Sequence, residues 1–155
     1  MYELSGDYGF WSELGPIGFV CRGEMTIMPK VSLAFFLAAA VCGLAGMIWG
    51  GYMGAAQDFQ WRDGHAHLNL VGWTTLSLMG SFYALSGDAR PKLLAWINFA
   101  LSTTGIVVFV PGLTMVAAGS PNALSFLVPG ALVLILGMGC FLSAVIIVFV
   151  RKPER

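Results

Sequence analysis

The chain has 155 residues, of which 57% are hydrophobic and only 10% are charged. A water-soluble domain of this size needs many more charged side chains to cover its surface. The formal net charge is zero, with eight Lys and Arg against eight Asp and Glu, so the basic excess of a nucleic-acid-binding protein is absent from the sequence. This composition is typical of an integral membrane protein.

Four apolar segments are each long enough to cross a hydrocarbon core, which takes about 20 helical residues. They lie near residues 31–55, 65–85, 93–117 and 123–150. Their apolar runs are continuous and lack the alternation of a barrel strand. We therefore expect an all-α fold, an integral membrane four-helix bundle formed by residues 28–155. Residues 1–27 are expected either to form an interfacial segment or to precede a translation start at Met25 or Met28.

Basic residues are unevenly shared among the connections between these segments. Most of them flank the first segment, the connection around residues 86–92 and the end of the fourth segment: Arg22, Lys30, Arg90, Lys92, Arg151, Lys152 and Arg155. The first connection carries only Arg62, beside Asp58 and Asp63. By the positive-inside rule, both termini are expected in the cytoplasm and the first connection outside.

Both histidines of the chain, His65 and His67, stand with Asn69 at the outer start of the second segment. A histidine that enters a bilayer must be neutral and either hydrogen-bonded or bound to a ligand, because hydrocarbon cannot satisfy its ring nitrogens. On an ideal helix the two rings point about 200° apart. One metal ion can therefore bind both only if His65 belongs to a turn that begins at Gly64.

Glycines inside the apolar segments predict close contacts with another helix or a ligand, and prolines predict irregular backbone. Gly46, Gly50 and Gly54 are spaced by four residues in the first segment, where a small surface admits another helix, a second copy or a flat cofactor. Pro111 and Pro129, each followed by glycine, lie at about the depth of the histidines. They predict either simple kinks or broken helices that line a cavity near the outer face.

Aromatic residues near the segment ends are typical of the interfacial belts of membrane proteins. They are Trp49, Tyr52, Phe59 and Trp61 at the outer end and Tyr83 and Trp96 at the inner end. Trp73 is different, because it lies about two turns inside the second segment.

The run from His65 to Trp73, HAHLNLVGW, followed by Met79 and Tyr83, resembles the second helix of the heme-copper oxidase catalytic-subunit (subunit I) family, nitric oxide reductases included. It is also similar to small four-helix bacterial membrane proteins labelled cytochrome oxidase subunit I-like. In the catalytic subunits, a histidine near the outer end of this helix is an axial ligand of the low-spin heme. Alignment on the following Asn and Trp gives this role to His67, whereas alignment on the His-Ala pair gives it to His65.

The resemblance implies a membrane b-type heme protein that transfers electrons or binds a diatomic gas. The residues expected to bind heme b are His65, His67, Asn69, Gly72, Trp73, Gly46 and Gly50. The large catalytic subunits have many more helices and metal-binding histidines, so this chain is not expected to be a complete oxidase or nitric oxide reductase by itself. A homodimer, with a histidine from each copy, and a respiratory-chain redox partner are the expected associations.

Two alternatives remain open from the residues alone. In the first, copper is bound at the outer surface by His65 and His67 with Asp63 or Asp58, since imidazole is a common copper ligand. In the second, the chain is an accessory or assembly subunit of a respiratory oxidase. The histidines and Asn69 would then form hydrogen bonds between helices. No residue is assigned a catalytic role.

Overall fold

The computed structural model describes residues 28–151, and every regular element in that range is a helix. The elements are α2 (Lys30–Ala56), α3 (Arg62–His67), the π-helix η1 (Leu68–Thr75), α4 (Leu76–Leu85), the short 3₁₀-helix η2 (Gly87–Ala89), α5 (Lys92–Ala117) and α6 (Ala123–Arg151). The helices α3, η1 and α4 follow one another without a break, and we call them together helix two. The prediction of an all-α chain with four helices is confirmed.

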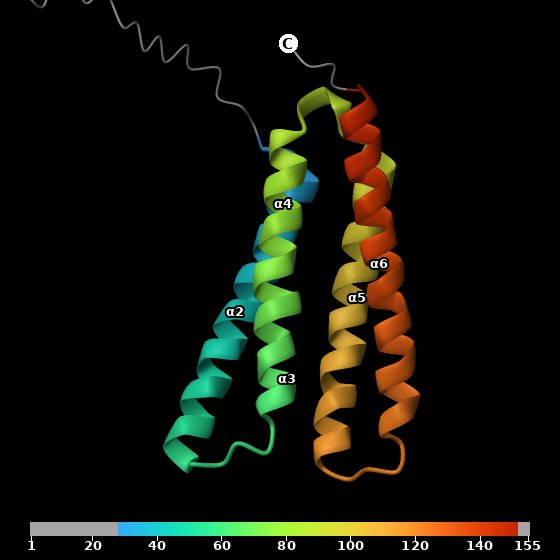
Figure 1. Cartoon of the computed structure of the whole chain (residues 1–155). Coiled ribbons are helices and arrows are strands. Elements are labelled where there is room, and N and C mark those ends of the chain that lie inside the picture. Colours follow the sequence, from blue (N-terminus) through green and yellow to red (C-terminus); the bar gives the residue numbers. More distant parts are fainter. Residues whose placement is uncertain (1–27, 152–155) are drawn as a thin grey trace, which may run out of the picture.

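The four helices form two antiparallel hairpins, α2 with helix two and α5 with α6 (Figure 1). The start of α2, the connection of residues 86–91 and the end of α6 lie at one end of the bundle, and the connections of residues 57–61 and 118–122 lie at the other. We call these the basic end and the histidine end. Three helices, α2, α5 and α6, are long and apolar enough to cross a membrane.

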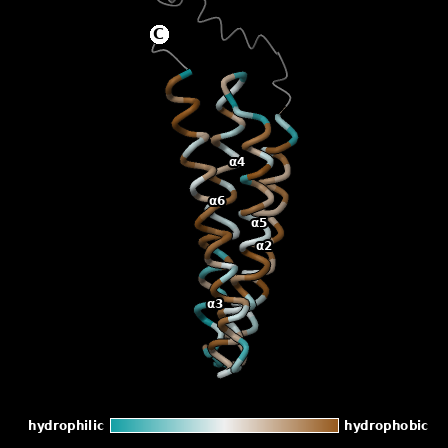
Figure 2. Tube along the Cα trace, turned by 90° about the vertical axis from the view of Figure 1, so that its right-hand side faces the viewer, coloured by the Kyte–Doolittle hydropathy of each residue, from teal (hydrophilic) through white to brown (hydrophobic). Residues whose placement is uncertain are grey.

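Large apolar side chains are exposed along the whole length of the bundle. Examples are Leu37 at 69% exposure on α2, Val107 at 70% on α5 and Ile135 at 66% on α6. Figure 2 shows that hydrophobic residues dominate the middle of the helices while hydrophilic residues concentrate towards the ends. A surface of this kind is stable in lipid rather than in water.

The α5–α6 hairpin is packed closely through glycine. A methyl group at Gly130 would lie 2.6 Å from the backbone nitrogen of Phe109, and one at Gly112 would meet the backbone of α6 at the same distance. Pro111 and Pro129 lie inside continuous helices, so the sequence-based alternative of broken helices at these positions is not realised. The glycines that follow these prolines allow α5 and α6 to approach closely, as expected where helix association depends on van der Waals packing.

A buried polar cluster joins the two hairpins in the half of the bundle nearer the basic end. The side-chain amide nitrogen of Asn98 on α5 donates a hydrogen bond to the hydroxyl of Tyr83 on α4 at 3.0 Å, and the hydroxyl of Ser102 donates to the side-chain amide oxygen Oδ1 of Asn98 at 3.0 Å. Tyr83 is fully buried, with its ring 5.5 Å from that of Phe35. The expectation that Tyr83 belongs to an interfacial belt is therefore wrong, because its hydroxyl has a protein partner in the core.

Candidate functional site

The π-helix η1 begins immediately after His67, in the middle of the run that predicts a ligand site. The hydroxyl of Thr75, at the end of this segment, donates a hydrogen bond to the backbone carbonyl of Leu70, five residues earlier, at 2.8 Å. Segments of π-helix are uncommon and often mark functional positions. Helix two is therefore locally irregular where three of the seven predicted heme-binding residues, Asn69, Gly72 and Trp73, lie.

His65 and His67 both belong to the regular helix α3, which includes Gly64. The alternative in which His65 sits in a turn beginning at Gly64 is not realised. Because residues two apart on an α-helix point about 200° apart, the two imidazole rings face different neighbours. One metal ion held by both rings would need a different backbone from the one observed.

His65 faces α2 and is packed against its glycine stripe. A methyl group at Gly50 would lie 2.8 Å from Cε1 of His65, and the ring of Trp49 meets the imidazole edge-on with centroids 6.3 Å apart. The amide of Asn69 donates to the backbone carbonyl of His65 at 2.9 Å. These contacts leave little space for a ligand at the ring of His65 itself.

The other predicted residues of helix two continue along the same interface. Asn69 lies against Gly46, where a methyl group would come within 2.5 Å of its amide, and Gly72 lies against Cys42 on α2. The indole of Trp73 packs over the backbone of α2 yet stays 47% exposed at the bundle surface. Asn69 and Trp73 border a second pocket of about 310 Å³ between α2 and helix two. All predicted heme-binding residues except His67 thus meet in the α2 interface.

His67 faces the opposite side, towards α5. Its Nδ1 lies 2.8 Å from the backbone carbonyl oxygen of Asp63, and its ring meets that of Phe109 edge-on with centroids 5.4 Å apart. A carbonyl can only accept, so Nδ1 must carry the proton, and in the neutral ring Nε2 then keeps a free lone pair. Metal-bound histidines commonly have this arrangement, in which a backbone carbonyl fixes the tautomer.

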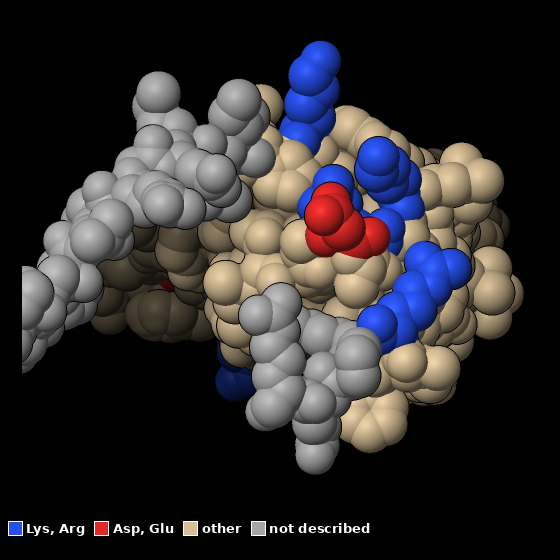
Figure 3. Space-filling view, turned by 90° about the horizontal axis from the view of Figure 1, so that it is seen from above, with Lys and Arg blue, Asp and Glu red and all other residues tan. Residues whose placement is uncertain are grey.

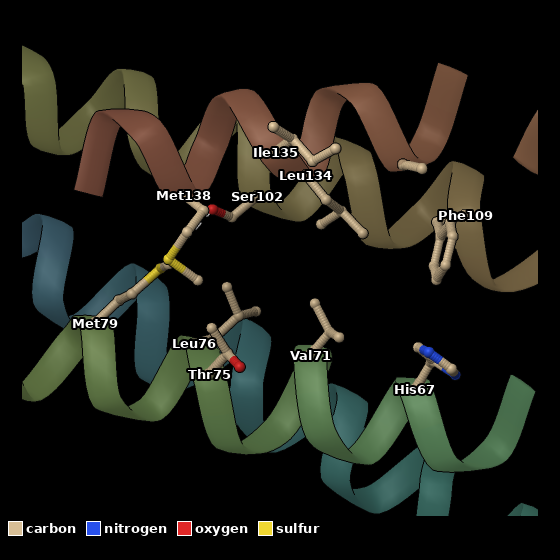
Figure 4. A pocket seen from close by; sticks show the side chains of 11 residues that line it. His67, Val71, Thr75, Leu76, Met79, Ser102, Phe109, Leu134, Ile135 and Met138 are labelled. Carbon is tan, nitrogen blue, oxygen red and sulfur yellow. Dashed lines mark hydrogen bonds between the residues drawn. The ribbon is translucent and has the colours of Figure 1, made fainter. Parts of the chain in front are cut away.

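His67 forms one end of an apolar cavity of about 340 Å³ between helix two and the α5–α6 hairpin (Figure 4). Val71 and Leu76 supply the wall on helix two, Leu134 lies opposite on α6, and Met79 and Met138 line the other end. Ile135 and Met138, which border the cavity on α6, are 66% and 49% exposed, so the cavity opens to the surroundings along α6. Its volume is at the lower end of the range of small-molecule sites.

This cavity meets the main requirements of a flat apolar cofactor with a metal centre. It offers one imidazole with a fixed tautomer, aliphatic walls and an open side through which the edge of a macrocycle can extend. A second ligand from the same cavity is remote, because Met79 lies twelve residues from His67 along helix two, about three turns away. A heme placed in this cavity would therefore have one ligand from this chain, His67.

The carboxylates of the alternative copper site, Asp58 and Asp63, interact with residues next to them in the sequence. Asp63 Oδ1 lies 3.5 Å from the guanidinium of Arg62, and Asp58 Oδ1 accepts a hydrogen bond from the backbone of Gln60 at 3.0 Å. Within residues 28–151, no three His, Cys, Asp or Glu side chains converge as a metal-binding group.

Several cavity residues were not predicted from the sequence. Phe109, Leu134 and Met138 come from the second hairpin, and only the folded structure brings them opposite His67. Their apolar character is shared by most residues of α5 and α6, so no local pattern distinguishes them.

Comparisons with known proteins identify no relative. No family model matches the chain, and neither curated proteins nor solved structures match it. The resemblance of residues 65–85 to a helix of the heme-copper oxidases remains a prediction.

Proposed function

We propose that the chain is a membrane b-type heme protein, related to heme-copper oxidase subunit I, in which His67 is an axial ligand of the heme iron. The main support for this proposal is the hydrogen bond of His67 Nδ1 to the backbone carbonyl of Asp63 at 2.8 Å. This bond leaves Nε2 available to a ligand, and His67 lines an apolar cavity. The heme would supply reversible one-electron chemistry or a binding position for a diatomic gas. His65, packed against Gly50, would hold helix two on α2.

In this proposal, the chain supplies one ligand to the heme iron, His67. Two modes of action are then conceivable, and they differ in what would occupy the second ligand position of the iron. In a homodimer, the second ligand would be a histidine of the other copy, and such a site would suit electron transfer with a respiratory-chain partner. In a monomer, the position is open to a gas molecule. In neither mode is the chain proposed to be a complete oxidase or nitric oxide reductase by itself, since the sequence has only two histidines.

The proposed orientation places four spans in a bacterial inner membrane, with both termini in the cytoplasm and the histidines towards the outside. The described cations at the basic end, Lys30, Arg90, Lys92 and Arg151, support it. The histidine end carries only one described cation, Arg62.

The test compares the wild type with His67→Ala and His65→Ala, each purified from membranes in mild detergent. We expect a b-type spectrum, oxidised and reduced, from the wild type and from His65→Ala, and a loss of more than tenfold in extracted heme from His67→Ala. Wild-type protein that lacks heme after expression with ample heme supply would reject the proposal. Equal heme in both variants would reject the role of His67.

The packing of His65 favours a second candidate, an accessory or assembly subunit of a respiratory oxidase. Its ring and backbone contact Trp49, Gly50 and Asn69, as expected of a histidine that serves helix packing. Co-purification with a larger oxidase, without heme or copper in this chain, would favour this candidate over the first.

A further inference from the structure

Most of the charged residues that the structure describes at the basic end of the bundle are Lys or Arg. Four of the five Lys and Arg residues within 28–151 lie there: Lys30 at the start of α2, Arg90 and Lys92 at the junction to α5, and Arg151 at the end of α6. Asp88 is the only described acidic residue of this end. Figure 3 shows the Lys and Arg side chains distributed around this face.

These cations are not neutralised by the described part of the chain. The single ion pair found within residues 28–151 joins Arg62 and Asp63 at the histidine end. Arg90 is held in place by hydrogen bonds from Nη1 to the backbone carbonyls of Tyr83 and Gly87, at 3.3 and 3.4 Å. Its Nε is buried without an acceptor among the described residues. The guanidinium is thus fixed at the bundle end without an ion-pair partner within residues 28–151.

The helix ends add to the positive potential. Both α2 and α5 begin at this end, with Pro29 and Pro91 as capping residues, no side-chain cap and no acidic residue in the first turn. The N-terminus of a helix carries a partial positive charge, which acidic or capping side chains usually compensate. Here the cations and two helix N-termini have the same sign and reinforce one another.

Exposed apolar side chains stand immediately beside the charges. Leu93 follows Lys92 and is 76% exposed, and Val150 precedes Arg151 and is 75% exposed. A soluble anion would gain nothing from these neighbours, whereas a phospholipid offers both a phosphate and acyl chains. The order of cation and apolar residue along each helix matches the order of headgroup and hydrocarbon in a leaflet.

We propose that the basic end is a binding surface for the phosphate headgroups of anionic phospholipids, with Arg90, Lys92, Lys30 and Arg151 as the contacts. This surface lies at the opposite end of helix two from His67, so the proposal is independent of the heme. Each cation near an anionic membrane surface strengthens binding by roughly fivefold. Replacing two cations should therefore weaken lipid binding about 25-fold.

The test is native mass spectrometry of the full-length protein, titrated with phosphatidylglycerol or phosphatidylcholine. The variant Lys92→Gln/Arg151→Gln removes two cations that make no hydrogen bond or ion pair among the described residues, and Arg62→Gln removes the cation of the histidine end. Circular dichroism verifies that each variant keeps the helical content of the wild type. A variant that has lost helix is replaced by Lys30→Gln/Lys92→Gln.

We expect the wild type and Arg62→Gln to retain phosphatidylglycerol in preference to phosphatidylcholine, and the double variant to lose that preference. Retention of both lipids to the same extent by the wild type would overturn the proposal. So would an equal loss in Arg62→Gln and the double variant. Glycerol phosphate is the soluble control. If it binds as tightly as phosphatidylglycerol, the assignment of the surface to a lipid headgroup is overturned.

Discussion

Replacing Gly130 with alanine should destabilise the bundle, because the α5–α6 hairpin leaves no space for a methyl group at this position. The added carbon would lie 2.6 Å from the backbone nitrogen of Phe109 and 2.7 Å from its Cα, whereas ordinary contact begins at 3.4 Å. Backbone atoms cannot rotate away as a side chain can, so the two helices must separate along their interface. Overpacking of this kind costs about 1–3 kcal/mol.

Gly139 on the same helix provides the matched control. A methyl group there would meet nothing within 4 Å, so Gly139→Ala should not lower the free energy of unfolding and should raise it by at most about 1 kcal/mol, because alanine has the higher helix propensity. Titration of the detergent-solubilised protein with dodecyl sulfate, followed by tryptophan fluorescence, measures both variants. Equal stability of Gly130→Ala and the wild type, or an equal loss in Gly139→Ala, would refute the close packing of α5 on α6.

Two further predictions concern the contacts of helix two. Gly50→Ala should lower stability by about 1 kcal/mol, because the methyl group would press on the ring of His65 at 2.8 Å. Gly54→Ala, where a methyl group would meet nothing within 4 Å, should not lower stability. The same titration compares the two variants. Asn98→Leu and Tyr83→Phe should each cost about 0.6–1.7 kcal/mol, since each breaks the same buried hydrogen bond. A double-mutant cycle in which the two losses simply add would contradict that bond.

The helices could be predicted from the sequence because each apolar segment exceeds the length that a membrane requires and is bounded by charged or turn-forming residues. Lys30 and Arg151 mark the ends of α2 and α6, and a glycine with positive φ, Gly119 at 69°, follows α5. The separation of His65 from His67 also followed from helix periodicity alone.

Other features depend on tertiary contacts that no local pattern reveals. Tyr83 looked like an interfacial residue because it is near a helix end, yet Asn98 on α5 gives its hydroxyl a buried partner. The π-helix after His67 has no marker in a run of ordinary apolar and polar residues. The cavity beside His67 needs Phe109 and Leu134 from the other hairpin, so neither its position nor its lining could be predicted.

The most direct test of the proposed heme site is chemical rescue of His67→Gly with free imidazole. The truncated side chain leaves a space next to the carbonyl of Asp63, which imidazole can fill from the aqueous side at the histidine end. We predict that purified His67→Gly lacks the b-type heme absorption, that added imidazole and heme restore it, and that His65→Gly binds heme without imidazole. A His67→Gly variant that keeps its heme absorption without imidazole would contradict the assignment of His67 as the iron ligand.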